Sequence, residues 1–422
     1  MRSAPPEALP RGTIRGGGLV IVISMALGAC GGDRAGDGAE SSELSLRERA
    51  LAFGLEPIPP EPPRPLENPL DAERVELGRL LFFDPILSGA QDVACSTCHL
   101  PRLAFADGRQ FGVGAGGSGL GPERTVPETP DLRPMPRNSP TVLNAGLYGR
   151  NGTTPSVNGM MFWAGTAFGL EDQVLNPMTA DKELRGLAYA KVHAMDSILA
   201  KLRGIDEYAD RFADAFTDIV TVHGKDLDRV ITATTLRRAL AAYVRELITP
   251  ESPFDRYLRG DEAGLSDSQR EGLELFIGNA GCVQCHRGPL LSDFQRHVLG
   301  TLQEGLGRDT TPGMDIGWGE AGGTRFAFRT PPLRQVELTA PYFHAGTAPT
   351  LQAVMRFKNK GVSANPDVAN SALDTLIYPL GLSDAEIASL VSFLASLTDS
   401  ETVQGPLFLH PQRVPSGLDV PR

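Results

Sequence analysis

The chain has 422 residues, of which 41% are hydrophobic and 22% charged, and its formal net charge at pH 7 is -11. This composition is ordinary for a soluble globular protein, and the length predicts more than one domain. An acidic chain without a basic run excludes nucleic acid as an expected partner and suits basic or neutral protein partners.

The first 30 residues look like an export signal. Basic residues precede a short apolar run at 19–27, which is too short to span a bilayer. The run ends in residues 27–30 (LGAC), similar to the lipobox of bacterial lipoproteins. We expect residues 1–29 to be a signal peptide and Cys30 to be the lipidated first residue of the mature chain, with an ordinary signal peptidase site as the alternative. The protein would then lie in the periplasm or cell envelope and meet the membrane only through its lipid anchor.

Residues 30–68 are predicted to be a tether. Gly, Ser and acidic residues come first, and six prolines follow between positions 57 and 65, a composition typical of extended linkers. A short helix over 43–52 is expected within it. The globular part is predicted to start near position 69, with a helix over 71–82 whose apolar residues recur at helical spacing.

Amphipathic helices and Gly- or Pro-rich loops make up the rest. Helical patterns cover 183–216 and 227–247, and a hinge is expected at 250–253. Two capping boxes, Ser266 with Gln269 and Ser383 with Glu386, predict the starts of two more helices. No strand-like alternation of any length is present.

Two copies of the sequence C-x-x-C-H, at 95–99 and 282–286, are the signature of covalent c-type haem. The two thiols bond to the haem vinyl groups and the adjacent imidazole binds the iron. The residues are Cys95, Cys98 and His99, and Cys282, Cys285 and His286. A zinc ribbon made of two C-x-x-C pairs is the alternative, but the adjacent histidines and the wide separation of the pairs argue against it.

The two motifs lie in a weak internal repeat. Residues 78–82 (GRLLF) precede the first motif and residues 272–276 (GLELF) precede the second, which indicates a duplicated unit. We therefore expect an all-α fold in which two cytochrome-c-like haem domains, residues 69–250 and 251–400, pack together with long irregular loops. A tail over 401–422 would follow.

With these motifs the chain resembles the bacterial di-haem cytochrome c peroxidases and the related enzymes that mature methylamine dehydrogenase, over about residues 70–400. The resemblance is carried by residues 77–85 (LGRLLFFDP), 137–144 (RNSPTVLN), 162–163 (FW), 328–334 (FRTPPLR) and 338–346 (LTAPYFHAG). It implies an exported oxidoreductase that reduces hydrogen peroxide at the N-terminal haem. Electrons would come from a small cytochrome c or cupredoxin through the C-terminal haem.

The resemblance also assigns roles near the first haem. Glu183 would be the general acid/base, because one carboxylate can move a proton from the near to the far peroxide oxygen. The alternative is a solvated glutamate at a helix start. Gln173 would donate in the same pocket, and Trp163 would help electrons cross between the haems, unless it is plain core. The family's Asp and Arg after this Trp are Ala164 and Thr166 here, which weakens the expected inter-haem hydrogen-bond network.

The distal face of the first haem is expected to be open. Many peroxidases of the family hold a histidine there, but no histidine lies between His99 and Arg137. Pro130 occupies about that position, and Met135 is a poor substitute. The resemblance to the maturation enzymes therefore implies reaction with peroxide without reductive activation.

The sixth ligand of the second haem, a Met or Tyr in the family, falls on Lys358. A lysine binds iron only if its pKa is strongly lowered, whereas Met355, one helical turn earlier, is a conventional ligand. Five-coordinate iron is the third option. The resemblance also implies one Ca²⁺ between the haems, and the residues at the family's calcium positions are Asn138, Thr339 and Pro341.

We expect surface or packing roles for three other histidines, His193, His223 and His410. We expect His297 and His344 to lie beside the second haem without binding iron.

Two other functions stay open. One is the oxidation of Tyr or Trp residues in an exported protein substrate, which the missing distal histidine favours. The other is electron transfer without catalysis, against which Glu183 argues.

Overall fold

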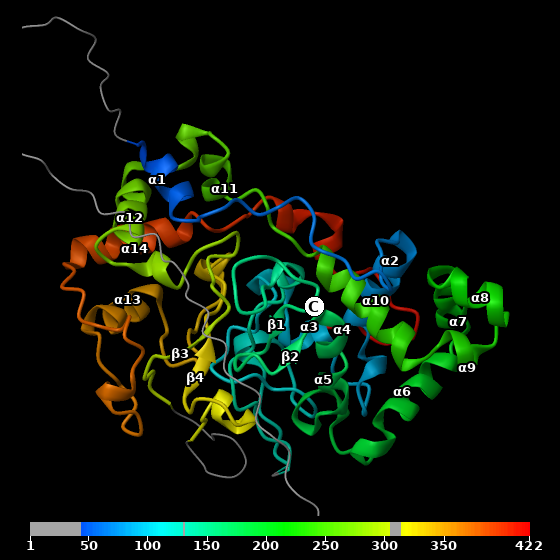
Figure 1. The fold of residues 1–422 in the computed structure, drawn as a ribbon. Helices are drawn as coiled ribbons and strands as arrows, with labels where there is room; N and C mark the ends of the chain where they lie inside the picture. Colours follow the sequence, from blue (N-terminus) through cyan, green and yellow to red (C-terminus); the bar gives the residue numbers. More distant parts are fainter. Residues whose placement is uncertain (1–43, 130, 304–313) are drawn as a thin grey trace, which may run out of the picture. The chain divides into compact units, whose positions relative to one another are not determined.

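The computed structural model describes residues 44–129, 131–303 and 314–422. The predicted signal peptide, Cys30 and Pro130 lie outside the described residues. The described residues are mostly helical, as predicted (Figure 1). The helices surround two large hydrophobic clusters. The helices are α1 (Leu46–Ala52), α2 (Ala72–Phe83), α3 (Cys95–Cys98), α4 (Leu170–Gln173), α5 (Asn176–Thr179), α6 (Ala194–Arg203), α7 (Asp206–Ala215), α8 (Thr217–His223), α9 (Leu227–Val230), α10 (Ala233–Glu246), α11 (Pro253–Leu258), α12 (Asp267–Ile277), α13 (Leu351–Lys360) and α14 (Asp384–Ala395).

The first hydrophobic cluster is centred on α2 and α10, which pack against each other. Their crossing is close because Gly78 of α2 has no side chain. A Cβ atom there would lie 2.0 Å from the carbonyl oxygen of Ala239 in α10. The glycine of the first repeat unit therefore permits a helix contact that no other residue would allow.

The second cluster repeats this arrangement with α12 and α14. A Cβ atom on Gly272 would lie 2.0 Å from the carbonyl oxygen of Ser389. Capping boxes on Ser266 and Ser383 begin the two helices, as predicted. The two units of the sequence repeat thus share a structural feature. In each unit, the helix before the haem motif packs closely against a second helix at a glycine.

The helix predicted over 183–216 is wrong in detail. The pattern over 183–216 is interrupted: Glu183 lies in a π-helical turn, Asp181–Arg185, and α6 begins only at Ala194. Gly186 has a φ of +58°, which ends the turn. Two small antiparallel ladders are also present, one pairing β1 (Met160–Met161) with β2 (Ala167–Phe168), the other pairing β3 (Arg296–Val298) with β4 (Ala327–Arg329).

Residues 44–68 are not a free tether. Leu55 and Ile58 are buried, the Ile58 amide donates to Asp255 Oδ1 at 2.8 Å, and Arg64 pairs with Glu246 at 2.6 Å. The prolines make the segment extended, as expected, but its apolar side chains hold it against the surface of the globular part. The predicted short helix is present as α1.

The last residues pack on the first hydrophobic cluster. Phe408 and Val414 belong to it, and Ser416 Oγ donates to the buried Asp84 at 2.7 Å. The ring of His410 packs 5.0 Å from that of Phe83, so its predicted packing role is confirmed. The predicted domain boundaries stay a prediction.

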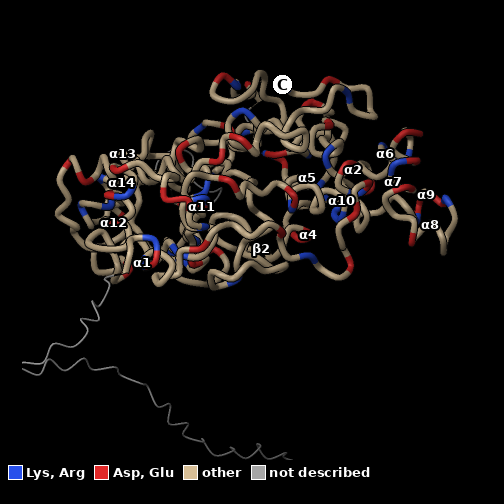
Figure 2. The backbone as a smooth tube through the Cα atoms, turned by 90° about the horizontal axis from the view of Figure 1, so that it is seen from above, with Lys and Arg blue, Asp and Glu red and all other residues tan. Residues whose placement is uncertain are grey.

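Charged residues of both signs are interspersed along the described part of the chain, without a long block of either (Figure 2). None of the described helices combines the length and the apolarity that crossing a bilayer requires.

Candidate functional site

The second C-x-x-C-H motif lines a cavity of about 250 Å³. Cys282, Cys285 and His286 all face it. Nδ1 of His286 lies 2.8 Å from the carbonyl oxygen of Leu291. A carbonyl can only accept, so Nδ1 carries the proton and Nε2 is free to bind a metal. Burial lowers the pKa of His286 to about 4, which keeps the imidazole in the neutral form that binds iron.

The first motif has the same construction. Nδ1 of His99 lies 3.1 Å from the carbonyl oxygen of Phe105, so this imidazole is also oriented by the backbone. Burial lowers its pKa and raises the pKa of the Cys95 and Cys98 thiols to about 12. Buried thiols beside an oriented neutral imidazole fit a c-type haem at both motifs.

The cysteines do not form a zinc ribbon. Among the described residues, the one grouping of three or more His, Cys, Asp or Glu ligand atoms is Cys285 with Asp293 and His297. The cysteines of the first motif take no part in it. Both nitrogens of His297 are engaged, Nδ1 with Asp374 at 2.6 Å and Nε2 with Asp293 at 3.1 Å.

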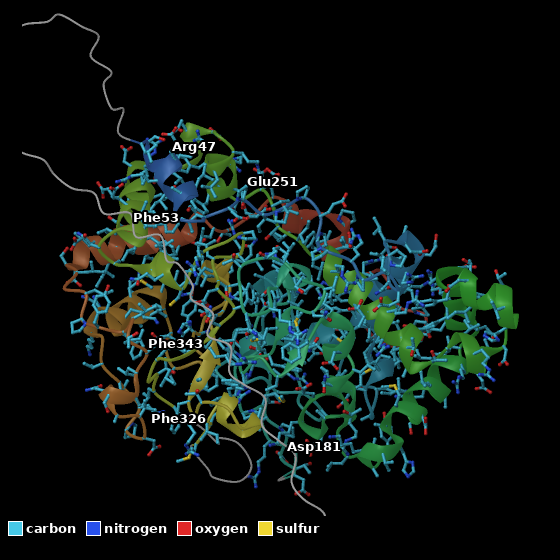
Figure 3. All side chains as sticks on the ribbon, viewed as in Figure 1. Arg47, Phe53, Asp181, Glu251, Phe326 and Phe343 are labelled. Carbon is cyan, nitrogen blue, oxygen red and sulfur yellow. The ribbon has the colours of Figure 1, made fainter. Side chains whose placement is uncertain are left out.

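Glu183 is half-buried in the π-helical turn. Burial raises the pKa of its carboxyl group to about 7, and the nearby charge of Asp181 adds to the shift. The Glu183 carboxylate in turn raises the pKa of both Cys95 and Cys98, so it lies close to the first haem motif. Glu183 thus lies in the first turn of a helical segment, but its carboxyl group is not fully solvated. The side chain of Asp181, which Figure 3 labels, is 49% exposed.

Two glycine-containing loops hold the turn of Glu183. The Ala115 amide donates to the Glu183 carbonyl at 2.8 Å, and the Gly89 amide donates to the Leu184 carbonyl at 2.8 Å. A Cβ atom on Gly114 would lie 2.3 Å from the Lys182 carbonyl oxygen and 2.7 Å from Glu183 Cα. The backbone that carries the carboxylate is thus fixed by contacts that require glycine.

We expect Gly114→Ala to slow peroxide reduction, because the added methyl group must displace the turn of Glu183. A displacement of about 1 Å can cost ~10²-fold in rate. The measurement is the rate constant for peroxide, compared with Gly204→Ala, whose added Cβ would meet no atom closer than 3.5 Å. Equal rates in both variants would contradict the positioning role of Gly114.

The sequence did not point to Arg124, a buried residue that is 5% exposed. Among the described residues, its guanidinium forms hydrogen bonds with backbone carbonyls. Its guanidinium donates to the carbonyls of Val113 at 2.6 Å, Gly114 at 2.7 Å and Gly119 at 2.7 Å. This side chain closes the Gly-rich loop beside Cys98, whose Sγ lies 3.7 Å from the Val113 carbonyl oxygen. A single arginine within a Gly-rich loop carries no sequence pattern that would have singled it out.

Trp163 lines the cavity of the second motif. Its indole Nε1 donates to the Asn138 carbonyl at 2.8 Å, and its own carbonyl accepts from the Arg329 amide at 2.8 Å. The indole plane is therefore held between two segments distant in sequence.

Two arginines bind the backbone around this tryptophan. Arg329, which is buried, donates to the Phe162 carbonyl at 3.1 Å, and Arg296 donates to the carbonyls of Ala164 at 2.9 Å and Gly165 at 2.5 Å. These hydrogen bonds fix the backbone of residues 162–165 without an acidic or basic side chain at position 164 or 166. The expected weakening of the inter-haem network by Ala164 and Thr166 stays a prediction.

The three residues at the predicted calcium positions, Asn138, Thr339 and Pro341, all line the cavity of the second motif, and the calcium site stays a prediction. The Asn138 amide nitrogen donates to the Arg109 carbonyl at 2.8 Å, so its Oδ1 is the atom left to accept or to bind a cation. His344 also lines this cavity.

Both candidates for the sixth ligand, Met355 and Lys358, line the cavity as well. Gln173, at the end of α4, is half-buried, and its carbonyl accepts from Asn176 at 3.2 Å; its predicted donor role stays a prediction. Met135 is held near Gly112, whose carbonyl accepts from the Met135 amide at 2.8 Å.

The family model of the di-haem cytochrome c peroxidases matches residues 72–263. The chain is 31% identical to the methylamine utilization protein MauG of Methylorubrum extorquens over 390 residues, 90% of this chain and 95% of that protein. It is 33% identical to the cytochrome-c peroxidase IdrP1 of a Pseudomonas species over 374 residues, 82% of this chain and 86% of the relative.

A solved structure described as a MauG-like protein associated with microbial copper homeostasis is also similar. It aligns with a TM-score of 0.68 at 30% identity and covers 84% of this chain and 97% of that one. The diheme peroxidase BthA of Burkholderia thailandensis shares the fold at 21% identity with a TM-score of 0.59. The chain therefore belongs to the di-haem cytochrome c peroxidase family and is a peroxidase-type oxidoreductase with two c-type haems.

Proposed function

We propose that this protein reduces hydrogen peroxide to water at its first haem, held by Cys95, Cys98 and His99, with Glu183 as the general acid/base. The observation that carries the proposal is the placement of the Glu183 carboxyl group beside the first haem motif with a pKa raised to about 7. A group with this pKa is both a competent base and a competent acid at neutral pH.

The bound haems supply the iron that cleaves the peroxide bond and stores electrons. Glu183 takes the proton from the near peroxide oxygen and returns it to the far one, so that water is the leaving group. Gln173 donates a hydrogen bond in the same pocket. His99, oriented by the Phe105 carbonyl and kept neutral by burial, would be the protein ligand of the iron.

Cys282 and Cys285 would hold the second haem, and His286 would be its iron ligand; the electron donor would be a small cytochrome c or cupredoxin. Trp163 lines the same cavity and would assist electron transfer between the two sites. Asn138 Oδ1 and the carbonyls of Thr339 and Pro341 would be the hard oxygen ligands of one Ca²⁺.

The halves that carry the two haems are proposed to extend over residues 69–250 and 251–400. We also propose that residues 1–29 are removed on export and that Cys30 is lipidated, which would place the protein in the periplasm or the cell envelope.

Oxidation of a protein substrate is the second candidate. The chain has no histidine between His99 and His193, so none from that segment can block the distal face of the first haem. Relatives include proteins named for methylamine utilization. An exported partner protein would then lose electrons from Tyr or Trp side chains to the oxidised haem pair.

Steady-state kinetics separate the two functions. We expect a haem-loaded preparation to consume peroxide with two equivalents of reduced cytochrome c or cupredoxin per peroxide. Haem content, measured first, should be two per chain. Fast reaction with peroxide but negligible turnover with every reduced donor would favour the oxidation of a protein substrate, and a protein inert to peroxide would contradict both functions.

A further inference from the structure

We infer that Lys358, and not Met355, is the second protein ligand of the iron at the C-terminal haem. This inference rests on the proposed attachment of that haem to Cys282 and Cys285. The two candidates lie on one face of α13, three residues apart, and both face the cavity that contains His286. The neighbours of each side chain distinguish them.

Met355 is used in packing. Its side chain contacts the second hydrophobic cluster, which α12 and α14 build. A methionine in this position has a sufficient structural role, since flexible thioethers commonly fill gaps at the edge of a core.

Lys358 has no such partner. Its amine forms no hydrogen bond or ion pair with any residue that the structure describes, although it faces the cavity. An unpaired ammonium group inside a protein is costly. Burial lowers its pKa and so favours the neutral amine, whose lone pair can bind iron.

The amine lies close to the haem motif. The Lys358 side chain lines the same cavity as Cys282, Cys285 and His286. Lys358 therefore shares the space in which the second haem would be attached.

The helical turn that carries Lys358 is fixed. The side chain of the next residue, Asn359, accepts from the Leu382 amide at 2.8 Å and donates to the Leu382 carbonyl at 2.8 Å. On the other side, the ring of Phe357 packs 5.2 Å from that of Phe343, which Figure 3 labels. With both neighbours anchored, the amine cannot leave the cavity by a shift of the backbone.

The test uses the full-length, haem-loaded protein in the oxidised state, studied by electron paramagnetic resonance and near-infrared magnetic circular dichroism. We expect Lys358→Ala to convert one of the two haems from low spin to high spin. Met355→Leu, the matched control on the same helix face, should leave the spectrum unchanged. Lys358→Met should restore a low-spin haem with the sulfur-to-iron band of thioether ligation, at an unchanged content of two haems per chain.

Two results would overturn the inference. One is a loss of the low-spin signal in Met355→Leu but not in Lys358→Ala, which would identify Met355 as the ligand. The other is no change in either variant, which would show that neither side chain binds iron. A wild-type chain with fewer than two haems would instead contradict the proposed function, so the two failures are distinguishable.

Discussion

Replacing Glu183 by glutamine is expected to lower the second-order rate constant for peroxide by at least ~10²-fold, the scale on which a positioned acid/base group contributes. The amide matches the carboxyl group in size and can donate a hydrogen bond, but it cannot accept and return a proton. Stopped-flow mixing of the haem-loaded variant with peroxide measures the effect. A rate constant within a few-fold of the wild type would remove Glu183 from the mechanism.

The pH profile gives an independent check. Glu183 must be ionised to take the first proton, and burial raises its pKa to about 7. The wild-type rate constant should therefore rise as the pH increases through about 7, and the profile of Glu183→Gln should be flat over that range.

Asp181→Asn is the matched control in the same turn. Its charge contributes to the raised pKa of Glu183, so removing it should shift the midpoint of the profile to lower pH and retain the rate at high pH. An unshifted midpoint would mean that another group governs the profile.

Asp255→Ala is expected to lower the free energy of unfolding by about 3–5 kcal/mol, the usual effect of leaving a buried charge without its partner. The Asp255 and Arg334 side chains are 0% and 1% exposed and lie 2.9 Å apart. Asp255 also accepts from the Ile58 amide at 2.8 Å, and Arg334 donates to the Glu56 carbonyl at 3.1 Å. Asp255→Ala therefore removes the hydrogen-bond acceptor of the Ile58 amide as well as one half of the ion pair with Arg334.

Denaturant unfolding of the haem-loaded protein measures this loss. Glu251→Ala breaks the exposed pair with Arg259, whose side chains are 52% and 38% exposed, and should cost less than about 1 kcal/mol. The double variant Asp255→Leu with Arg334→Met should recover part of the stability, because it leaves no buried charge. Equal costs for Asp255→Ala and Glu251→Ala would contradict the prediction.

Much of the fold could be predicted because its signals are local. The capping boxes at Ser266 and Ser383 determine where two helices begin, and the spacing of apolar residues predicts α2 to within one residue at each end. The repeat requires glycine at positions 78 and 272 for the same physical reason, the close approach of a second helix. Such features depend on neighbouring residues and need no knowledge of the rest of the chain.

The failures concern contacts between distant segments. The prolines between positions 57 and 65 predict an extended backbone. They do not show whether this backbone packs on the globular part, because that packing depends on Asp255, a carboxylate almost 200 positions later. The amphipathic pattern at 183–216 does not show that Gly114 and Ala115 hold Glu183 in a separate π-helical turn. The resemblance to a known family predicts the residues of the candidate site. It does not predict the residues that fix the geometry of the site.

The packing of the last residues on the first hydrophobic cluster has a consequence for biosynthesis. Phe408 and Val414 complete a core whose other members come mainly from the first 250 residues, and Ser416 supplies two of the hydrogen bonds to Asp84. The amino-terminal half cannot reach its final packing until residues 408–416 have been synthesised. Removing residues 408–416 should therefore impair the half that is translated first.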